Sequence, residues 1–279
     1  MPRARPIALI TCAAVTLLSC GGARSGDVRK NPLPDDPAGG GLRLSDIGDP
    51  ASPDAAKDRD PVAVTGVVVV AVDDFDETNN GRSRGAVYVQ DIGSTAPYSG
   101  LSLFSPTFVP SNLKVGPGDV LDIDGELQEN KQLGATRFPE GAALLQLAPV
   151  TRPEPGPLLA TFRYEHRAPE PVDIDIRELA DFATGRKWLN MLVRVRDVTV
   201  QTDAFRIGPN PRVAAPLLPG TTGRCDDPFP RPPTLVNELT DFDALQIRAN
   251  TRLRSVVGVV TFFCNLHIAP RSPADIQID

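Results

Sequence analysis

Alternating apolar positions and β-branched runs mark five short segments in the first half of the chain. Residues 62–70 form a Val-rich run interrupted by Gly66, and residues 85–91 alternate between apolar and polar positions. Residues 98–104, 120–127 and 142–147 follow, separated by turns rich in Gly, Pro and Ser. Such patterns are typical of strands. We therefore expect five strands, the first of which curls at Gly66, because glycine inside a strand marks a bulge or a sharp bend.

The second half repeats this pattern as a diverged copy. Residues 191–200 stand where the first half has residues 62–70, and residues 253–260 match residues 120–127, with Gly258 aligned to Gly125. Each half ends in an apolar residue followed by Ala-Pro. Ahead of the second copy, residues 174–182 (IDIRELADF) have helical spacing. The pattern predicts a second set of strands preceded by a short helix.

The composition favours an all-β fold. Proline accounts for 29 of 279 residues and recurs along the chain, which disfavours long helices. Five short strands with a glycine bend suit a small closed barrel. The expected architecture is therefore two tandem five-stranded barrels.

Three features of the first half carry a family resemblance: the strand centred on Gly66, the segments 88–91 and 98–100, and the turn 115–119 (VGPGD). Over about 90 residues they resemble the OB-fold modules of secreted and surface-attached bacterial proteins, a small β-barrel class. The resemblance implies OB-like barrels in both halves, and some such modules are joined to extracellular nucleases.

The N-terminus has the form of an export signal. Arg3 and Arg5 precede an apolar stretch at residues 7–18, which is too short to span a bilayer. Leu17-Leu18-Ser19-Cys20 resembles the lipobox of bacterial lipoproteins, which implies cleavage before Cys20 and acylation of its sulfur and amine, with the protein anchored by these lipids. Gly21, in place of Asp, favours the outer membrane. An ordinary secretory signal is the alternative.

These features divide the chain into five parts. We expect a signal peptide at residues 1–19, a flexible Gly- and Pro-rich tether at 20–41, and a first barrel at 42–148. A Pro-rich linker at 149–157 then leads to a second barrel at 158–279.

Two cysteines remain after export and acylation, Cys225 and Cys264. Because an exported protein meets an oxidising compartment, the natural interpretation is a disulfide between them. Two separate buried thiols are the alternative.

An acidic loop between the first two strands is a candidate calcium site. Asp74, Asp76, Thr78 and Asn80 offer oxygen atoms before Gly81, as in the first half of a calcium loop. Val87, however, stands where such a loop places its last acidic ligand. A solvated acidic hairpin explains the same residues through Asn-Gly turn chemistry.

No residue set forms a catalytic signature. Residues 81–85 (GRSRG) match a serine-hydrolase pattern, but they precede a strand, and the sequence offers only His166 and His267 as a base. Tyr88, Tyr98 and Phe104 are candidate ligand contacts. Residues 61–148 hold 5 Lys or Arg and 11 Asp or Glu, a net charge of −6, which disfavours nucleic acid because that binding is mostly electrostatic.

The sequence therefore predicts a membrane-anchored envelope lipoprotein that binds a protein or glycan partner without catalysis. One alternative is an accessory hydrolase or nuclease lipoprotein that uses a divalent ion at the acidic loop. Another is a surface module that binds nucleic acid through its barrel.

Overall fold

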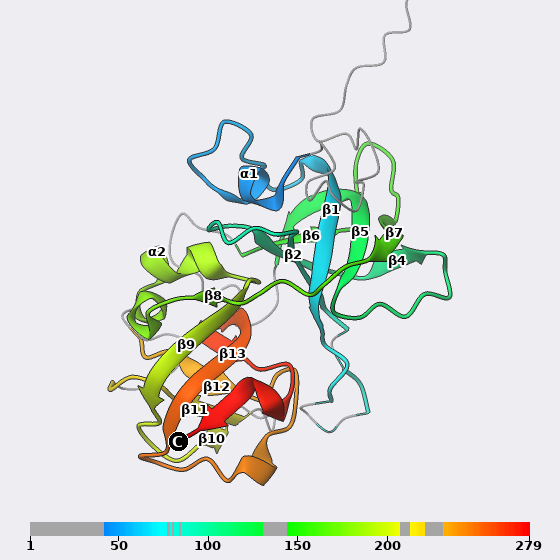
Figure 1. Cartoon of the computed structure of the whole chain (residues 1–279). Helices are drawn as coiled ribbons and strands as arrows, with labels where there is room; N and C mark the ends of the chain where they lie inside the picture. Colours follow the sequence, from blue (N-terminus) through cyan, green and yellow to red (C-terminus); the bar gives the residue numbers. More distant parts are fainter. Residues whose placement is uncertain are drawn as a thin grey trace, which may run out of the picture.

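The computed structural model describes residues 42–76, 79, 81–83, 85–130, 144–206, 213–220 and 231–279. These residues form two β-sheets that lie side by side, with a few short helical segments (Figure 1). The fold is mostly β, as expected. Among the described residues, no helix is both long enough and apolar enough to cross a membrane.

Five strands of the first sheet close into a barrel. They are β1 (Pro61–Val72), β2 (Val87–Asp91), β3 (Gly100–Leu103), β5 (Asp119–Glu129) and β6 (Leu145–Ala148). The pairing runs β1-β2-β3-β6-β5 and returns from β5 to β1. β3 and β6 are parallel, and the other pairs are antiparallel. The five strands expected from the sequence are confirmed in type and position.

Gly66 bends β1 as predicted. Its φ is 68°, and the register of β1 against β5 shifts between Val64 and Val67. The Gly66 N–H donates to Oδ1 of the buried Asp122 on β5 (3.1 Å). A left-handed φ is the conformation that glycine tolerates and other residues rarely adopt, so the chain needs glycine at this bulge.

The barrel encloses an apolar core from all five strands. The inward side chains include Val64, Val67, Val89, Leu121 and Ile123, each 1% exposed or less. A short helix, α1 (Leu44–Gly48), adds Leu44 and Ile47 to this core. The carboxylate of Asp91 accepts hydrogen bonds from the N–H groups of Leu44 (2.7 Å) and Ser45 (3.0 Å), which fixes α1 on the barrel.

Two further strands extend the first sheet, β4 (Pro106–Val109) and β7 (Leu158–Glu165). β7 pairs with β5 from Asp119↔Glu165 to Asp124↔Leu159, so it belongs to the first sheet and not to the second half. The expected boundary at residue 157 is therefore too early. Residues 149–157 form a turn closed by Gly156 N donating to Val150 O (2.9 Å), because their prolines and glycine suit a turn as well as a linker.

The second sheet contains eight strands. They are β8 (Val172–Asp173), β9 (Leu192–Thr199), β10 (Phe205–Arg206), β11 (Val213–Pro216), β12 (Thr234–Val236), β13 (Arg252–Phe263), β14 (Asn265–Ala269) and β15 (Ile276–Ile278). The order is β10-β11-β12-β14-β13-β9-β8, with β15 on β13. No ladder among the described residues joins β9 to β11, although Gln201 N, just after β9, donates to Pro216 O (2.9 Å). A second closed barrel is therefore not shown.

The two sheets nevertheless share a pairing register. Glu126 pairs with Ala148 and Val259 with Ala269, while Val62 pairs with Gly125 and Val193 with Gly258. In both sheets the strand that ends in Ala-Pro also runs parallel to a third strand, as Leu103↔Leu147 and Leu235↔Ile268. The alignment of Gly258 with Gly125 inferred from sequence thus corresponds to equivalent positions in space.

Helical turns precede β9, close to the predicted helix at residues 174–182. They are η2 (Ile176–Ala180), α2 (Phe182–Gly185) and η3 (Arg186–Trp188); η4 (Asp243–Leu245) and η5 (Pro273–Asp275) come later. Asp175 and Asp181 cap the first two by accepting from the N–H groups of Arg177 and Ala183. Short capped turns replace one continuous helix.

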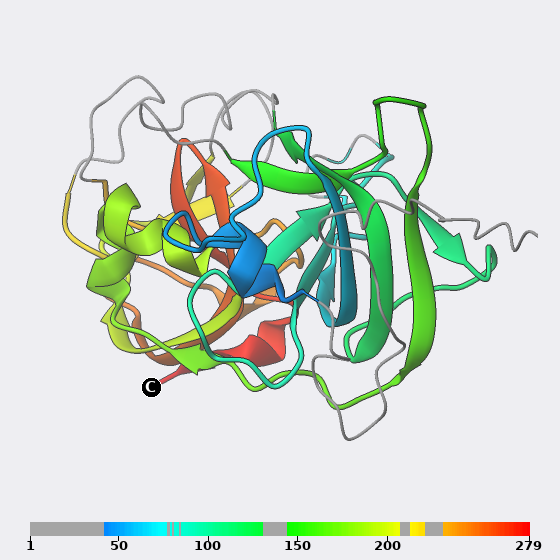
Figure 2. The same cartoon turned by 90° about the horizontal axis from the view of Figure 1, so that it is seen from above.

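An apolar seam joins the two sheets. Val70, Ala71 and Tyr88 of the first sheet form one buried cluster with residues of the second, including Leu192 and Val259. Gln90 Oε1 accepts from Leu192 N (3.0 Å) across this seam. Figure 2 shows the two halves in contact along it, with α1 in blue near the junction.

Candidate ligand-binding groove

A groove of about 400 Å³ lies where β2 and β3 of the first sheet meet the second sheet. Its aromatic lining comes from Tyr88, Phe104, Phe108 and Phe262, and its polar lining includes Gln146 and Glu238. Clefts that combine aromatic walls with a few placed polar groups are the usual form of a ligand site. The groove is therefore the candidate site.

Among the described lining residues, Phe104 carries the most exposed aromatic ring, and Phe108 is partly exposed. Phe104 follows β3 and is 47% exposed, whereas Tyr88 is 6% exposed because it packs into the seam. The Phe104 N–H donates to Leu147 O (2.8 Å), which holds its backbone against β6. Phe104 is therefore placed to contact a ligand, and Tyr88 forms part of the groove's floor.

The polar side of the groove is ordered by one buried pair. Thr261 Oγ1, on β13, donates to Glu238 Oε2 (2.7 Å), and both residues are less than 5% exposed. Among the described residues that line the groove, Glu238 is the charged one, and none is Lys or Arg. The lining therefore carries acidic rather than basic character.

The structure separates the three predicted aromatic contacts. Tyr88 and Phe104 line the same groove, but Tyr98 lines a second pocket between α1, β3 and the second half. Phe108 and Phe262 were not predicted. Phe262 had a sequence signal, since Thr261-Phe262-Phe263 continues the apolar run of residues 253–260; its position opposite β3 depends on how the sheets pack.

The acidic loop is described only in part. Asp74 is exposed, and Asp76 Oδ2 accepts from Gly81 N (2.6 Å); Thr78 and Asn80 lie outside the described residues. Within the described part, no three His, Cys, Asp or Glu side chains gather as a metal site would require. Calcium binding at this loop stays a prediction.

The cysteine predictions also fall partly outside the described residues. Cys20 and Cys225 lie there, whereas Cys264 is buried between β13 and β14. Acylation at Cys20 and the pairing of Cys225 with Cys264 stay predictions.

The two histidines lie in different surroundings. His267 is fully buried, where Nδ1 bonds with Thr234 Oγ1 and Nε2 lies 3.0 Å from Phe263 O. His166 is exposed, and its Nδ1 lies 3.0 Å from Arg167 O. Neither histidine lines the groove.

No family model matches the chain, and no curated protein matches it.

Proposed function

We propose that the protein is a lipid-anchored binding module of the bacterial cell envelope and that its groove binds a neutral oligosaccharide. The observation that carries the proposal is the groove itself, with an exposed aromatic ring opposite a buried, hydrogen-bonded acid. The lipobox-like segment Leu17-Leu18-Ser19-Cys20 supports the envelope location.

The strand order of the first barrel supports this choice of ligand. Taken in order along the barrel, its strands pair 1-2-3-5-4 and close back to strand 1, which fits the OB-like resemblance. OB-folds bind oligonucleotides or oligosaccharides over the face of strands 2 and 3. Tyr88 lies on strand 2, and Ser102 and Phe104 lie on or next to strand 3, at the groove.

Charge favours an oligosaccharide over a nucleic acid. A nucleic acid site needs basic groups for the phosphates, but the described lining holds Glu238 and no basic residue. A sugar ring offers an apolar C–H face to an aromatic ring and hydroxyl groups to carboxylate and amide oxygens. Phe104, with Glu238 and Gln146, supplies these complementary groups.

The test is an array of neutral and acidic oligosaccharides probed with the full chain carrying Cys20→Ala, followed by titration of the best ligand. Phe104→Ala should weaken its affinity about tenfold, equal to about 1.4 kcal/mol. Leu159→Ala is the matched control, because Leu159 is also exposed and apolar but lies outside the groove.

Salt dependence separates the alternatives. Glycan affinity should change little between low and high salt, because no phosphate contacts are involved. Binding of single-stranded nucleic acid that falls steeply with salt would contradict the proposal. So would the absence of any bound glycan, or equal loss of affinity in both variants.

A further inference from the structure

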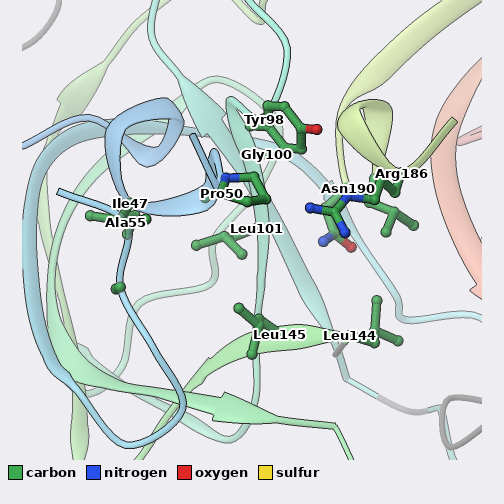
Figure 3. A pocket seen from close by; sticks show the side chains of 13 residues that line it. Ile47, Pro50, Ala55, Tyr98, Gly100, Leu101, Leu144, Leu145, Arg186 and Asn190 are labelled. Carbon is green, nitrogen blue, oxygen red and sulfur yellow. The ribbon is translucent and has the colours of Figure 1, made fainter. Parts of the chain in front are cut away.

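A second pocket, of about 230 Å³, lies between α1, β3 and the turn that follows η3. Figure 3 shows its apolar side chains, among them Ile47, Pro50, Leu101 and Leu145, with Arg186 and Asn190 facing them from the second half. It lies next to the groove, since Leu144 and Asn190 line both. Its lining is otherwise distinct.

The walls of this pocket are held by backbone contacts. Tyr98 N donates to Lys187 O (2.7 Å), and Ala56 N donates to Ile47 O (3.0 Å). A Cβ on Gly100 would lie 2.6 Å from the carbonyl carbon of Asn190, so the two halves meet here at backbone distance. The pocket is therefore part of the folded structure and not a gap between mobile parts.

Among the described residues that line the pocket, Arg186 is the cationic one, and it is partly buried. It forms no ion pair with any described residue. The neighbouring Lys187, in contrast, pairs with Glu178 (2.8 Å), which also accepts from Trp188 Nε1 (3.0 Å). A guanidinium partly withdrawn from water and without a carboxylate partner keeps donors that an anionic ligand can accept.

We propose that this pocket binds a small amphipathic carboxylate, such as a medium-chain aliphatic acid. The carboxylate would lie against Arg186, whose planar fork matches its two oxygens, with the Asn190 amide beside it. The chain would lie against Ile47, Leu101 and Leu145. The proposal does not rest on the glycan proposal, because Phe104 and Glu238 do not line this pocket, although Asn190 lines both.

The test is calorimetric titration of octanoate, below its micellar concentration, into the full chain carrying Cys20→Ala. Octanol in place of octanoate should bind about tenfold more weakly, because it has no carboxylate to accept charge-assisted hydrogen bonds from Arg186. Trp188, the one tryptophan of the chain, follows Arg186 by two residues in η3, so its fluorescence is a second readout to record during the titration.

Two variants separate specific binding from apolar adsorption. Arg186→Gln should weaken octanoate binding about tenfold, while Arg177→Gln, which alters an exposed arginine outside the pocket, should not. Ala55→Leu should block the pocket and abolish binding, with an unchanged circular dichroism spectrum as evidence of folding. Octanoate that does not bind, or binds Arg186→Gln as tightly as the parent, would overturn the proposal.

Discussion

At Glu126 a buried carboxylate on β5 is held by four donor groups. Thr151 N (2.7 Å) and Thr151 Oγ1 (2.8 Å) donate to it, as do Arg59 Nη1 (3.0 Å) and Gln128 Nε2 (3.1 Å). Burial raises the pKa of this carboxyl group, but the hydrogen bonds from Thr151 and Arg59 outweigh burial, so its pKa lies below the usual value. Glu126 thus links β5 to Arg59, just before β1, and to Thr151, after β6.

The stabilisation by Glu126 should depend on pH. Because its pKa is lower in the folded state, the contribution is complete above the ordinary pKa of about 4.5 and is lost as the pH falls through the folded pKa. Glu126→Gln should lower the free energy of unfolding by about 1.5–3 kcal/mol at neutral pH. Urea unfolding of both proteins should show this difference shrinking toward pH 3; a constant difference would refute the charged role.

A second prediction at the residue scale concerns the substitution of Gly66. Gly66→Ala would force a Cβ into a left-handed conformation and should cost about 1–2 kcal/mol. Gly116→Ala is the control, since no atom lies within 4 Å of a Cβ there and its φ is not left-handed. Thermal unfolding of the two variants should separate them, and equal melting temperatures would show that the bulge relaxes.

At the scale of elements, Gly125 and Gly258 occupy equivalent places against the strand that ends in Ala-Pro, which is β6 in the first sheet and β14 in the second. A Cβ on Gly258 would lie 2.7 Å from Ala269 O, and one on Gly125 would lie 3.0 Å from Ala148 O. In both cases the partner is the Ala of the Ala-Pro pair. The close approach of the strands explains why glycine stands at both positions.

Gly258→Ala should therefore destabilise the second sheet. The new methyl group would also lie 2.7 Å from Ile268 Cγ2, and overpacking of this kind costs about 1–3 kcal/mol. Gly156→Ala, whose Cβ has its nearest neighbour at 4.0 Å, should change the free energy of unfolding by less than about 0.5 kcal/mol. Denaturant titration of both variants measures their free energies of unfolding. An unchanged free energy of unfolding for Gly258→Ala would contradict the close approach of β13 to β14.

The positions of the strands could be predicted from the sequence better than the pairing between strands. The strand at Gly66 and the long strands containing Gly125 and Gly258 were visible because β-branched periodicity is local. The pairing of β7 with β5 was missed because it joins residues 35 to 46 positions apart, from Asp124↔Leu159 to Asp119↔Glu165, beyond a Pro-rich turn that resembles a linker. Phe262 was missed for a related reason, since only sheet packing brings it to the groove that Phe104 lines.

At the scale of the molecule, the seam makes the two sheets one unit. Gln90 Oε1 accepts a hydrogen bond from Leu192 N across the seam, and Gln90 Nε2 donates to Ser94 O (2.9 Å). Tyr88 packs into the same seam and into the floor of the groove. The candidate groove therefore exists only when both sheets are folded and joined.

Gln90→Ala should weaken both halves together. Leaving Leu192 N–H buried without its acceptor costs about 1–3 kcal/mol, whereas Gln277→Ala, at an exposed position on β15, should cost little. Native-state hydrogen exchange should show β5 and β13 losing protection by the same amount. Loss confined to one sheet would show that the two fold independently.

The most direct test of the account is hydrogen exchange of the Cys20→Ala chain with and without its best oligosaccharide. If the groove is the binding site, added protection is concentrated in the backbone around Phe104 and Phe108 and around Thr261 and Phe262, the two sides of the groove. Protection confined to the acidic loop at Asp74 and Asp76, or spread over the outer face of either sheet, would contradict it.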